Sequence, residues 1–199
     1  RRDPGSGRRT RAVVGLWGTP RADGWIGDRR RQLTGTTVQP PGRRATCTVH
    51  PVTSVGERLG RDPGDRLLIL TADLLGMCHA SNVGVYECLR SGLATGAGLM
   101  VPGPWARDAA SHYRGEPVGV HLTLNAELDR YRWRAITQAP SLHDGDGGFP
   151  RTVDDLWNHA DLDETRRECR AQLERAVLWG FDVSHLSTHL GALQNRPEF

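Results

Sequence analysis

The chain has 199 residues, with 26 basic and 23 acidic side chains and a formal net charge of +3. This length suits one ordinary domain with an extension, and no apolar stretch approaches the roughly 18 residues of a membrane span. Every basic residue is arginine, and the four cysteines form no CxxC pair. That cysteine pattern argues against a structural zinc site and against a disulfide framework, and unpaired thiols favour a cytoplasmic location.

Charge is distributed unevenly along the chain. Residues 1–66 hold 14 arginines and six acidic residues, whereas residues 67–199 hold 12 arginines and 17 acidic residues. The first part is also rich in Gly and Pro and poor in the aliphatic residues that build a core. We therefore expect residues 1–65 to be a disordered basic tail and residues 66–199 to form the folded domain. An arginine-rich arm for nucleic acid is the alternative, but such arms usually mix Lys with Arg, so nucleic acid is not the expected partner.

From residue 67 onward, short apolar runs alternate with amphipathic helical segments. Strands are predicted at residues 67–70, 99–101, 118–122 and 183–190. Helices are predicted at about residues 82–91, 104–114 and 163–179, with an irregular loop over 125–160. This alternation predicts an α/β fold in which helical crossovers join parallel strands.

The predicted strands are too few to complete a barrel. Four strands cannot close a barrel of about eight. We therefore expect a partial (β/α) barrel of the glycoside hydrolase and deacetylase type, whose C-terminal strands are missing from this chain. Exposed strand edges would favour association into a homo-oligomer.

Polar residues stand at the carboxyl ends of three predicted strands. Asp73 follows the first strand, His121 lies in the third and His189 ends the fourth. Ligands of parallel α/β folds bind at this edge of the sheet, and an Asp with two imidazoles suits a divalent metal that keeps open positions. Strand alternation also places Gly119 and His121 on the face opposite the apolar residues. A hydrogen-bonded core histidine is the alternative interpretation at each position.

Four segments taken together resemble the YdjC-like carbohydrate deacetylases, also called ChbG-type diacetylchitooligosaccharide deacetylases. They are LILTADLLGMCHASN at 68–82, LMVPGPW at 99–105, VGVHLTL at 118–124 and HLSTHLGALQNRPEF at 185–199. The resemblance covers residues 66–199 only. It implies a distorted (β/α) barrel that hydrolyses an N-acetyl group of an amino sugar with a divalent metal, Mg²⁺ being expected and Zn²⁺ the alternative.

The resemblance also implies roles for individual residues. The family's metal-binding histidines correspond to His121 and His189, and the first of its two adjacent Asp residues corresponds to Asp73, the expected general base. Leu74 occupies the second Asp position, and Ser187 stands where the family usually has Asp. Since loss of charged ligands weakens divalent binding, the alternative is a catalytically impaired relative that binds sugar without hydrolysing it.

Three further residues are candidates for binding a small carbohydrate substrate. His79 lies in the turn after the first strand, and its alternative interpretation is a solvent-exposed start of a helix. Arg132 and Trp133 follow Tyr131 in the long loop, where an aromatic pair around an arginine suits a sugar face and its hydroxyl groups. Packing of this loop on the rim of the fold is the alternative. No membrane partner is expected.

Overall fold

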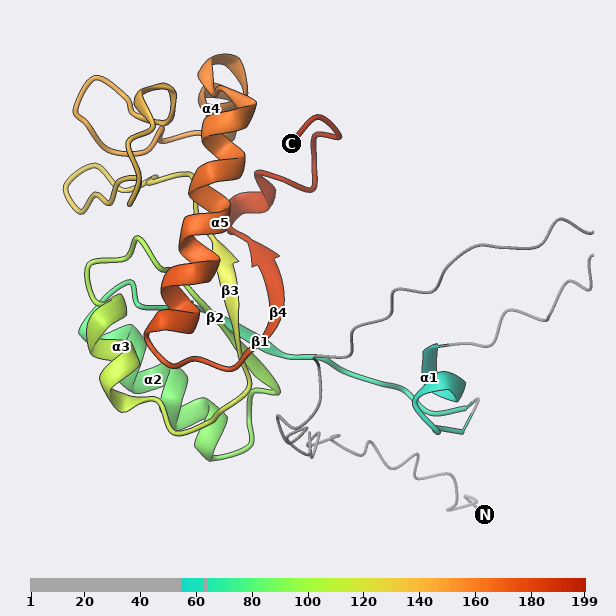
Figure 1. Ribbon diagram of the computed structural model, residues 1–199. Helices are drawn as coiled ribbons and strands as arrows, with labels where there is room; N and C mark the ends of the chain where they lie inside the picture. The colour runs from blue at the N-terminus through green and yellow to red at the C-terminus, as the bar shows by residue number, and fades with distance from the viewer. Residues whose placement is uncertain (1–54, 63) are drawn as a thin grey trace, which may run out of the picture. The chain divides into compact units, whose positions relative to one another are not determined.

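The structure, a computed structural model, describes residues 55–62 and 64–199 (Figure 1). The chain divides into two units, residues 1–67 and residues 68–199. In the described part of the first unit, helix α1 covers Val55–Arg58. Most of the predicted tail, including the arginine clusters considered as a nucleic-acid arm, lies outside the described residues. Within the part of the chain that is described, no helix has the length and apolar character needed to cross a membrane.

The second unit is a parallel sheet with helices. The strands are β1 Thr71–Leu75, β2 Gly96–Leu99, β3 Val118–Leu122 and β4 Val183–Thr188, in spatial order β1-β2-β3-β4. The helices are α2 His79–Arg90, α3 Ala106–His112, α4 Val153–His159 and α5 Leu162–Leu178, with short 3-10 helices η1 at Pro140–Leu142 and η2 at His189–Gly191. The predicted α/β class and parallel order are confirmed, while the assignment of this sheet to a partial barrel stays a prediction.

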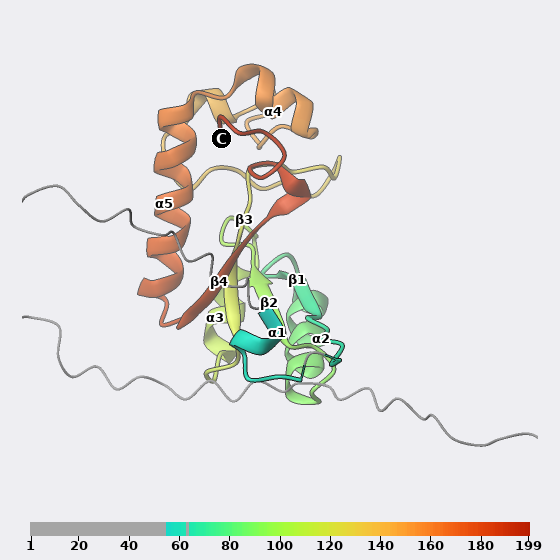
Figure 2. The ribbon, with the colours of Figure 1, turned by 90° about the vertical axis from the view of Figure 1, so that its right-hand side faces the viewer.

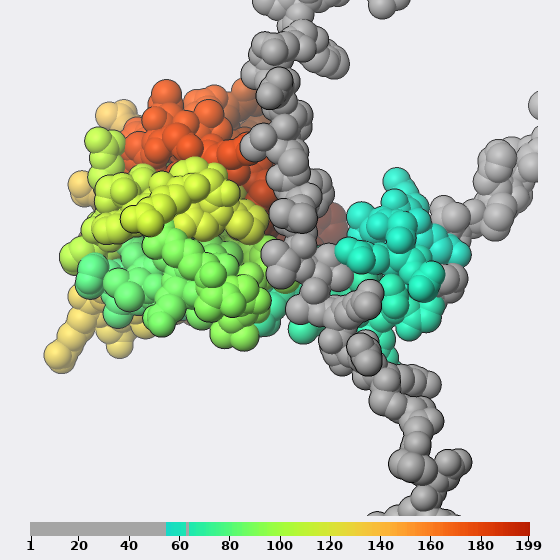
Figure 3. All heavy atoms as spheres, turned by 90° about the horizontal axis from the view of Figure 1, so that it is seen from below, coloured from blue at the N-terminus to red at the C-terminus, as the bar shows by residue number. Residues whose placement is uncertain are grey.

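The main core lies between the sheet and helices α2, α3 and α5 (Figures 1 and 2). In space filling, α2, α3 and the end of α5 form adjoining green, yellow-green and red bands (Figure 3). Alternate residues of the two central strands face this core; they are Ala97, Leu99, Val118, Val120 and Leu122. Burying each large aliphatic side chain contributes about 1.5–3 kcal/mol. As predicted, the same alternation turns Gly119 and His121 to the other face of the sheet.

The first strand starts later than predicted. Residues 67–70 do not form a buried strand; β1 begins at Thr71, and residues 68–70 expose 43–83% of their surface. Leu70 is joined to the sheet by Thr95: its N–H donates to the Thr95 hydroxyl, and its carbonyl accepts from the Thr95 N–H and hydroxyl. The apolar run is therefore an exposed segment that precedes strand β1.

Strand β1 contains a bulge that redirects its side chains. Ala72 pairs with Ala97 and Leu75 pairs with Leu99, so β1 has one extra residue between these pairs. Because of this insertion, Ala72 and Leu75 both pack on the core although they are three residues apart. Leu74 is left 40% exposed.

The turns after β1 and β2 are held together by one buried amide. Helix α2 begins at His79, earlier than predicted, because Cys78 supplies its N-cap. Asn82, inside this helix, accepts a hydrogen bond from the Gly76 N–H at 2.7 Å and donates to the Trp105 carbonyl at 3.0 Å. Two loops at the carboxyl edge of the sheet are thereby fixed to each other.

The segment predicted as an irregular loop has structure of its own. It contains η1 and α4, and the Thr152 side chain caps α4 by accepting a hydrogen bond from the Asp155 N–H. A second apolar cluster packs between this segment and neighbouring parts of the chain; its large members are Met100, Leu124, Trp133, Leu142, Phe149 and Leu156. The loop prediction was therefore wrong for α4, whose seven residues are too few to show a helical period.

Helix α5 anchors this segment to the sheet through two buried polar side chains. The Glu168 carboxylate accepts hydrogen bonds from the N–H groups of Ile136 and Thr137 at 3.1 and 2.9 Å. The Gln172 amide accepts from the Thr123 N–H, donates to the Thr123 carbonyl and donates to Glu168 at 2.9 Å. These bonds fix the chain immediately after β3 without leaving the buried carboxylate unpaired.

The approach of β4 to β3 requires glycine at position 119. A Cβ there would lie 2.7 Å from the His185 ring and closer still to the His185 carbonyl. We predict that Gly119→Ala lowers the free energy of unfolding by about 1–3 kcal/mol, because the backbone of β4 must shift. Urea denaturation measures this change.

The matched control is Gly84→Ala in α2, where a Cβ meets nothing within 4 Å. This substitution is expected to raise stability by about 0.5–1 kcal/mol, since alanine is the better helix former. A Gly119→Ala variant as stable as the parent would show that the sheet does not depend on this close approach.

Candidate functional site

The face of the sheet opposite the helices gathers the candidate residues. Asp73 comes from β1, His121 from β3 and Ser187 from β4, while His189 follows directly after β4. His121 and Ser187 are register partners on neighbouring strands. Gly98, on β2, leaves room between the side chains of its two neighbours, β1 and β3, since a Cβ there would lie 2.9 Å from Asp73 Oδ1 and 3.0 Å from His121 Cβ.

His121 and His189 contact each other directly. His121 Nε2 lies 3.3 Å from His189 Nδ1, and the two rings meet edge to face with centroids 5.3 Å apart. Each residue is only 5% exposed. The outer ring nitrogens also have partners: His121 Nδ1 lies 2.7 Å from Ser187 Oγ, and His189 Nε2 lies 2.9 Å from Glu127 Oε2. The four side chains form one hydrogen-bonded row.

Asp73 presents a buried oxygen that lacks a partner. Among the residues the structure describes, none donates a hydrogen bond to its Oδ1 atom. Buried polar atoms nearly always have a partner in the protein or in bound water. This oxygen is therefore free to accept a proton, a water molecule or a cation on the same face as the histidines.

Burial sets the ionisation of His121. It lowers the pKa of His121 to about 4, although the charge of Asp73 opposes the shift, and His189 and His185 add to it. His121 is thus neutral near pH 7 and keeps a lone pair on one ring nitrogen. This is the form of histidine that ligates a metal or accepts a hydrogen bond.

A strained turn directs His189 across the sheet. β4 ends at Thr188, and His189 opens η2, in which Leu190 has φ of 52°. Leu190 is the one non-glycine residue with positive φ among those described. This conformation costs roughly 1–2 kcal/mol for a bulky residue. Backbone strain of this kind is common at functional sites, where it fixes the orientation of a side chain.

His79 lies at the carboxyl edge but outside the histidine row. Its side chain is 61% exposed, and its ring is 5.3 Å from that of Trp105. It also lines a groove of about 560 Å³ between α2 and α3, with Tyr86, Asp108 and His112 among the other lining residues. This groove contains none of the polar residues of the sheet face, so we place the candidate site at the histidine pair instead.

Trp133 and Arg132 are adjacent but have different surroundings. Trp133 is 3% exposed, its ring centroid is 6.2 Å from that of His189, and its indole N–H donates to the Asn125 carbonyl. It therefore packs against His189. Binding of a sugar by Trp133, Arg132 or His79 stays a prediction.

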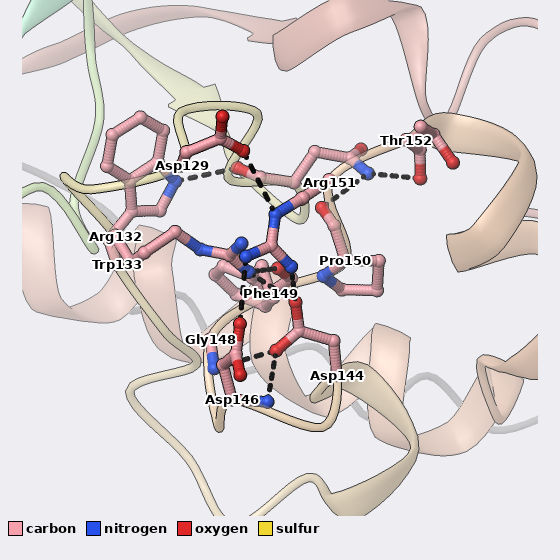
Figure 4. A network of polar contacts seen from close by, with 11 residues as sticks. Asp129, Arg132, Trp133, Asp144, Asp146, Gly148, Phe149, Pro150, Arg151 and Thr152 are labelled. Carbon is pink, nitrogen blue, oxygen red and sulfur yellow. Dashed lines mark hydrogen bonds and ion pairs between the residues drawn. The ribbon is translucent and has the colours of Figure 1, made fainter.

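Arg132 belongs to an ion-pair network in the long loop (Figure 4). Its Nη2 atom lies 2.5 Å from Asp144 Oδ2 and donates to the Phe149 carbonyl, and Arg151 also binds Asp144 at 2.9 Å. Burial would raise the pKa of Asp144, but hydrogen bonds led by that from Arg132 lower it overall. In this structure, Arg132 therefore joins two parts of the long loop through its bonds to Asp144 and Phe149.

Sequence reasoning missed Glu127. It stands six residues after His121, in the loop that leaves β3, and its carboxylate reaches His189. The sequence does show an acidic residue shortly after a candidate ligand, at the carboxyl edge of a strand. That position could have indicated a partner for a histidine. Nothing in the periodicity indicated toward which residue the loop would turn it.

The side chains on this face of the sheet offer nitrogen and oxygen donor atoms of the kinds that bind divalent metals. Within residues 55–62 and 64–199, no three His, Cys, Asp or Glu side chains are gathered closely enough to form a ready metal site. Two imidazole nitrogens nevertheless face each other, one of them on a neutral histidine, and Asp73 carries an unpartnered oxygen. The chemistry of this donor set fits a divalent cation.

The sequence profile of the YdjC-like protein family matches residues 67–199. The chain belongs to the YdjC-like family. A carbohydrate deacetylase of Thermus thermophilus is 44% identical over 142 residues, which cover 71% of this chain and 50% of that protein. A chitooligosaccharide deacetylase of Yersinia pestis is 29% identical over 134 residues, covering 63% and 49%. The chain thus spans about half the length of these relatives.

A solved structure supports the fold of this YdjC-like chain. It is that of a protein from Enterococcus faecalis described as a proposed cellobiose-phosphate cleavage protein, with a TM-score of 0.54 and 26% identity. The match covers 61% of this chain and 47% of the other. The family inferred from four sequence motifs is thereby confirmed, together with the start of its similarity near residue 66.

The lowered pKa of His121 predicts a loss of stability in acid. Between pH 6.5, the ordinary pKa, and about 4, the unfolded chain binds a proton that the folded chain does not. The free energy of unfolding should therefore fall as the pH falls through this window. Urea denaturation in EDTA, at about pH 7 and about pH 4.5, measures the difference.

In His121→Gln this titration is absent, so stability should fall less between the two pH values. His159→Gln, which changes a histidine with a 69% exposed side chain, is the control and should keep the pH dependence of the parent. Equal pH dependence in the parent and His121→Gln would contradict the assignment.

Proposed function

We propose that this chain carries the metal-dependent site of a carbohydrate deacetylase, which hydrolyses the N-acetyl group of an amino sugar or chito-oligosaccharide. The observation that carries the proposal is the facing pair of His121 Nε2 and His189 Nδ1, 3.3 Å apart, on the face that also holds the unpartnered carboxylate oxygen of Asp73. The names of the relatives, carbohydrate deacetylase and chitooligosaccharide deacetylase, support the same chemistry.

His121 and His189 are the residues that would hold the cation. Their imidazoles suit Zn²⁺ and related metals, while the carboxylate of Asp73 and water suit Mg²⁺. Mg²⁺ remains the expected metal and Zn²⁺ the alternative. When bound, a divalent cation polarises a carbonyl oxygen and lowers the pKa of a water molecule.

Asp73 would supply the acid–base chemistry. Its Oδ1 atom accepts a proton from water as the water oxygen bonds to the acetyl carbon. When the carbon–nitrogen bond breaks, the same carboxyl group returns the proton to the departing amine. The products are a free amino sugar and acetic acid, which releases its proton to water and becomes acetate. Burial of His121 keeps its imidazole neutral and prevents it from competing for this proton near pH 7.

Two residues favour a second candidate, a relative that binds sugar without hydrolysing it. Leu74 is apolar and 40% exposed, and it offers no ligand beside Asp73. Ser187 is uncharged and lies against His121 Nδ1. With fewer charged ligands, a divalent cation is held more weakly.

Substitution at Leu74 separates the two candidates. If the site is active, Leu74→Asp should raise the metal-dependent kcat/KM about tenfold or more, because it adds a carboxylate at the residue next to Asp73. The assay measures acetate released from chito-oligosaccharides with added Mg²⁺ or Zn²⁺. His121→Ala and His189→Ala should lose both metal binding and acetate release.

Leu93→Asp is the matched control, since Leu93 is an exposed apolar residue away from the sheet face, with 65% of its surface accessible. It should leave activity unchanged. Metal binding to the parent without acetate release, from either the parent or Leu74→Asp, would support the sugar-binding relative and contradict the deacetylase.

A further inference from the structure

Glu127 holds the outer end of the hydrogen-bonded row. Its side chain is 35% exposed, whereas that of His189 is 6% exposed. Within the described chain, the contact with His189 Nε2 at 2.9 Å is the one hydrogen bond that the Glu127 carboxylate makes. Among the described residues, this carboxylate therefore bonds to the His189 ring and forms no ion pair with an arginine.

The chemistry of the pair fixes where the proton of His189 lies. A neutral imidazole has one N–H group and one lone pair, whereas an ionised carboxylate only accepts hydrogen bonds. In the neutral form of His189, the Nε2 atom that faces Glu127 therefore carries the proton. The lone pair is then on Nδ1, which is the atom that faces His121 at 3.3 Å.

Ser187 imposes no such choice on His121. A hydroxyl group both donates and accepts hydrogen bonds. Ser187 Oγ, 2.7 Å from His121 Nδ1, is a suitable partner whether or not that nitrogen carries the proton. The row thus has one fixed end, at Glu127, and one adaptable end, at Ser187.

We propose that Glu127 is the positioning residue of the histidine pair. Its carboxylate holds His189 in the Nε2–H tautomer and presents Nδ1 as the donor atom for a divalent cation. Carboxylates commonly orient metal-binding histidines in this way. The inference rests on the proposed function for its cation, but the tautomer exists independently of catalysis.

Nitrogen-15 NMR of the metal-free protein at about pH 7.5 reports which ring nitrogen carries the proton. The parent should show His189 protonated on Nε2. Glu127→Ala should give a mixture of tautomers, because water replaces the fixed acceptor. Glu127→Gln should also weaken the preference, but less than Glu127→Ala, because its amide can either accept a hydrogen bond from Nε2–H or donate one to Nε2.

Calorimetric titration with Mg²⁺ and Zn²⁺ supplies a second readout. The affinity for the cation should fall about 10–100-fold in Glu127→Ala and by a smaller factor in Glu127→Gln. The control is Asp129→Ala in the same loop, which removes an 88% exposed carboxylate and should change neither the tautomer nor the affinity.

Two results would overturn the proposal. One is a parent spectrum with the His189 proton on Nδ1, a measurement that needs no variant to fold. The other is a Glu127→Ala protein that keeps both the parental tautomer and the parental affinity. If the parent shows the expected tautomer but binds no cation, the metal dependence of the proposed function fails while the tautomer supports the role of Glu127.

Discussion

The polar face of the sheet depends on glycines in the two central strands, β2 and β3. They stand where side chains from the neighbouring strands converge. At Gly98, a Cβ would lie within 3.0 Å of both Asp73 and His121, and at Gly119 it would meet the His185 ring. The opposite face of the same strands is apolar and buried under α2, α3 and α5. One face therefore stabilises the fold, and the glycines free the other for groups that a packed core would exclude.

The sequence predicted those parts of the molecule that follow from strand alternation. Within β3, the side-chain period of two placed Gly119 and His121 opposite the core, and the order of elements predicted parallel strands whose carboxyl ends meet. These two regularities place His121 and His189 at the same edge of the sheet, and the turn at Leu190 then brings the two rings together. The position of β1 was wrong because its bulge and the exposed segment that precedes it break the same regularity.

The remaining features arise from contacts between distant segments. The loop after β3 acquires its path from Glu168 and Gln172 on α5, and neither helical residue is distinctive in the sequence. Glu127 reaches His189 because the chain has already been fixed by these bonds. Such partners are set by tertiary geometry, which a single sequence does not encode in its periodicity.

The turn at Leu190 links the site to a distant helix. Leu190 is 48% exposed, so burial of its side chain does little to offset its backbone strain. The turn is instead secured from α4, where the Trp157 indole N–H donates to the carbonyl of the buried Ala192 at 2.9 Å. Helix α4 has only seven residues, and short helices open locally at a smaller free energy than a sheet. Mild heating is therefore expected to release His189 through fraying of α4 while the strands remain folded, so that the thermal limit of the site lies below that of the domain.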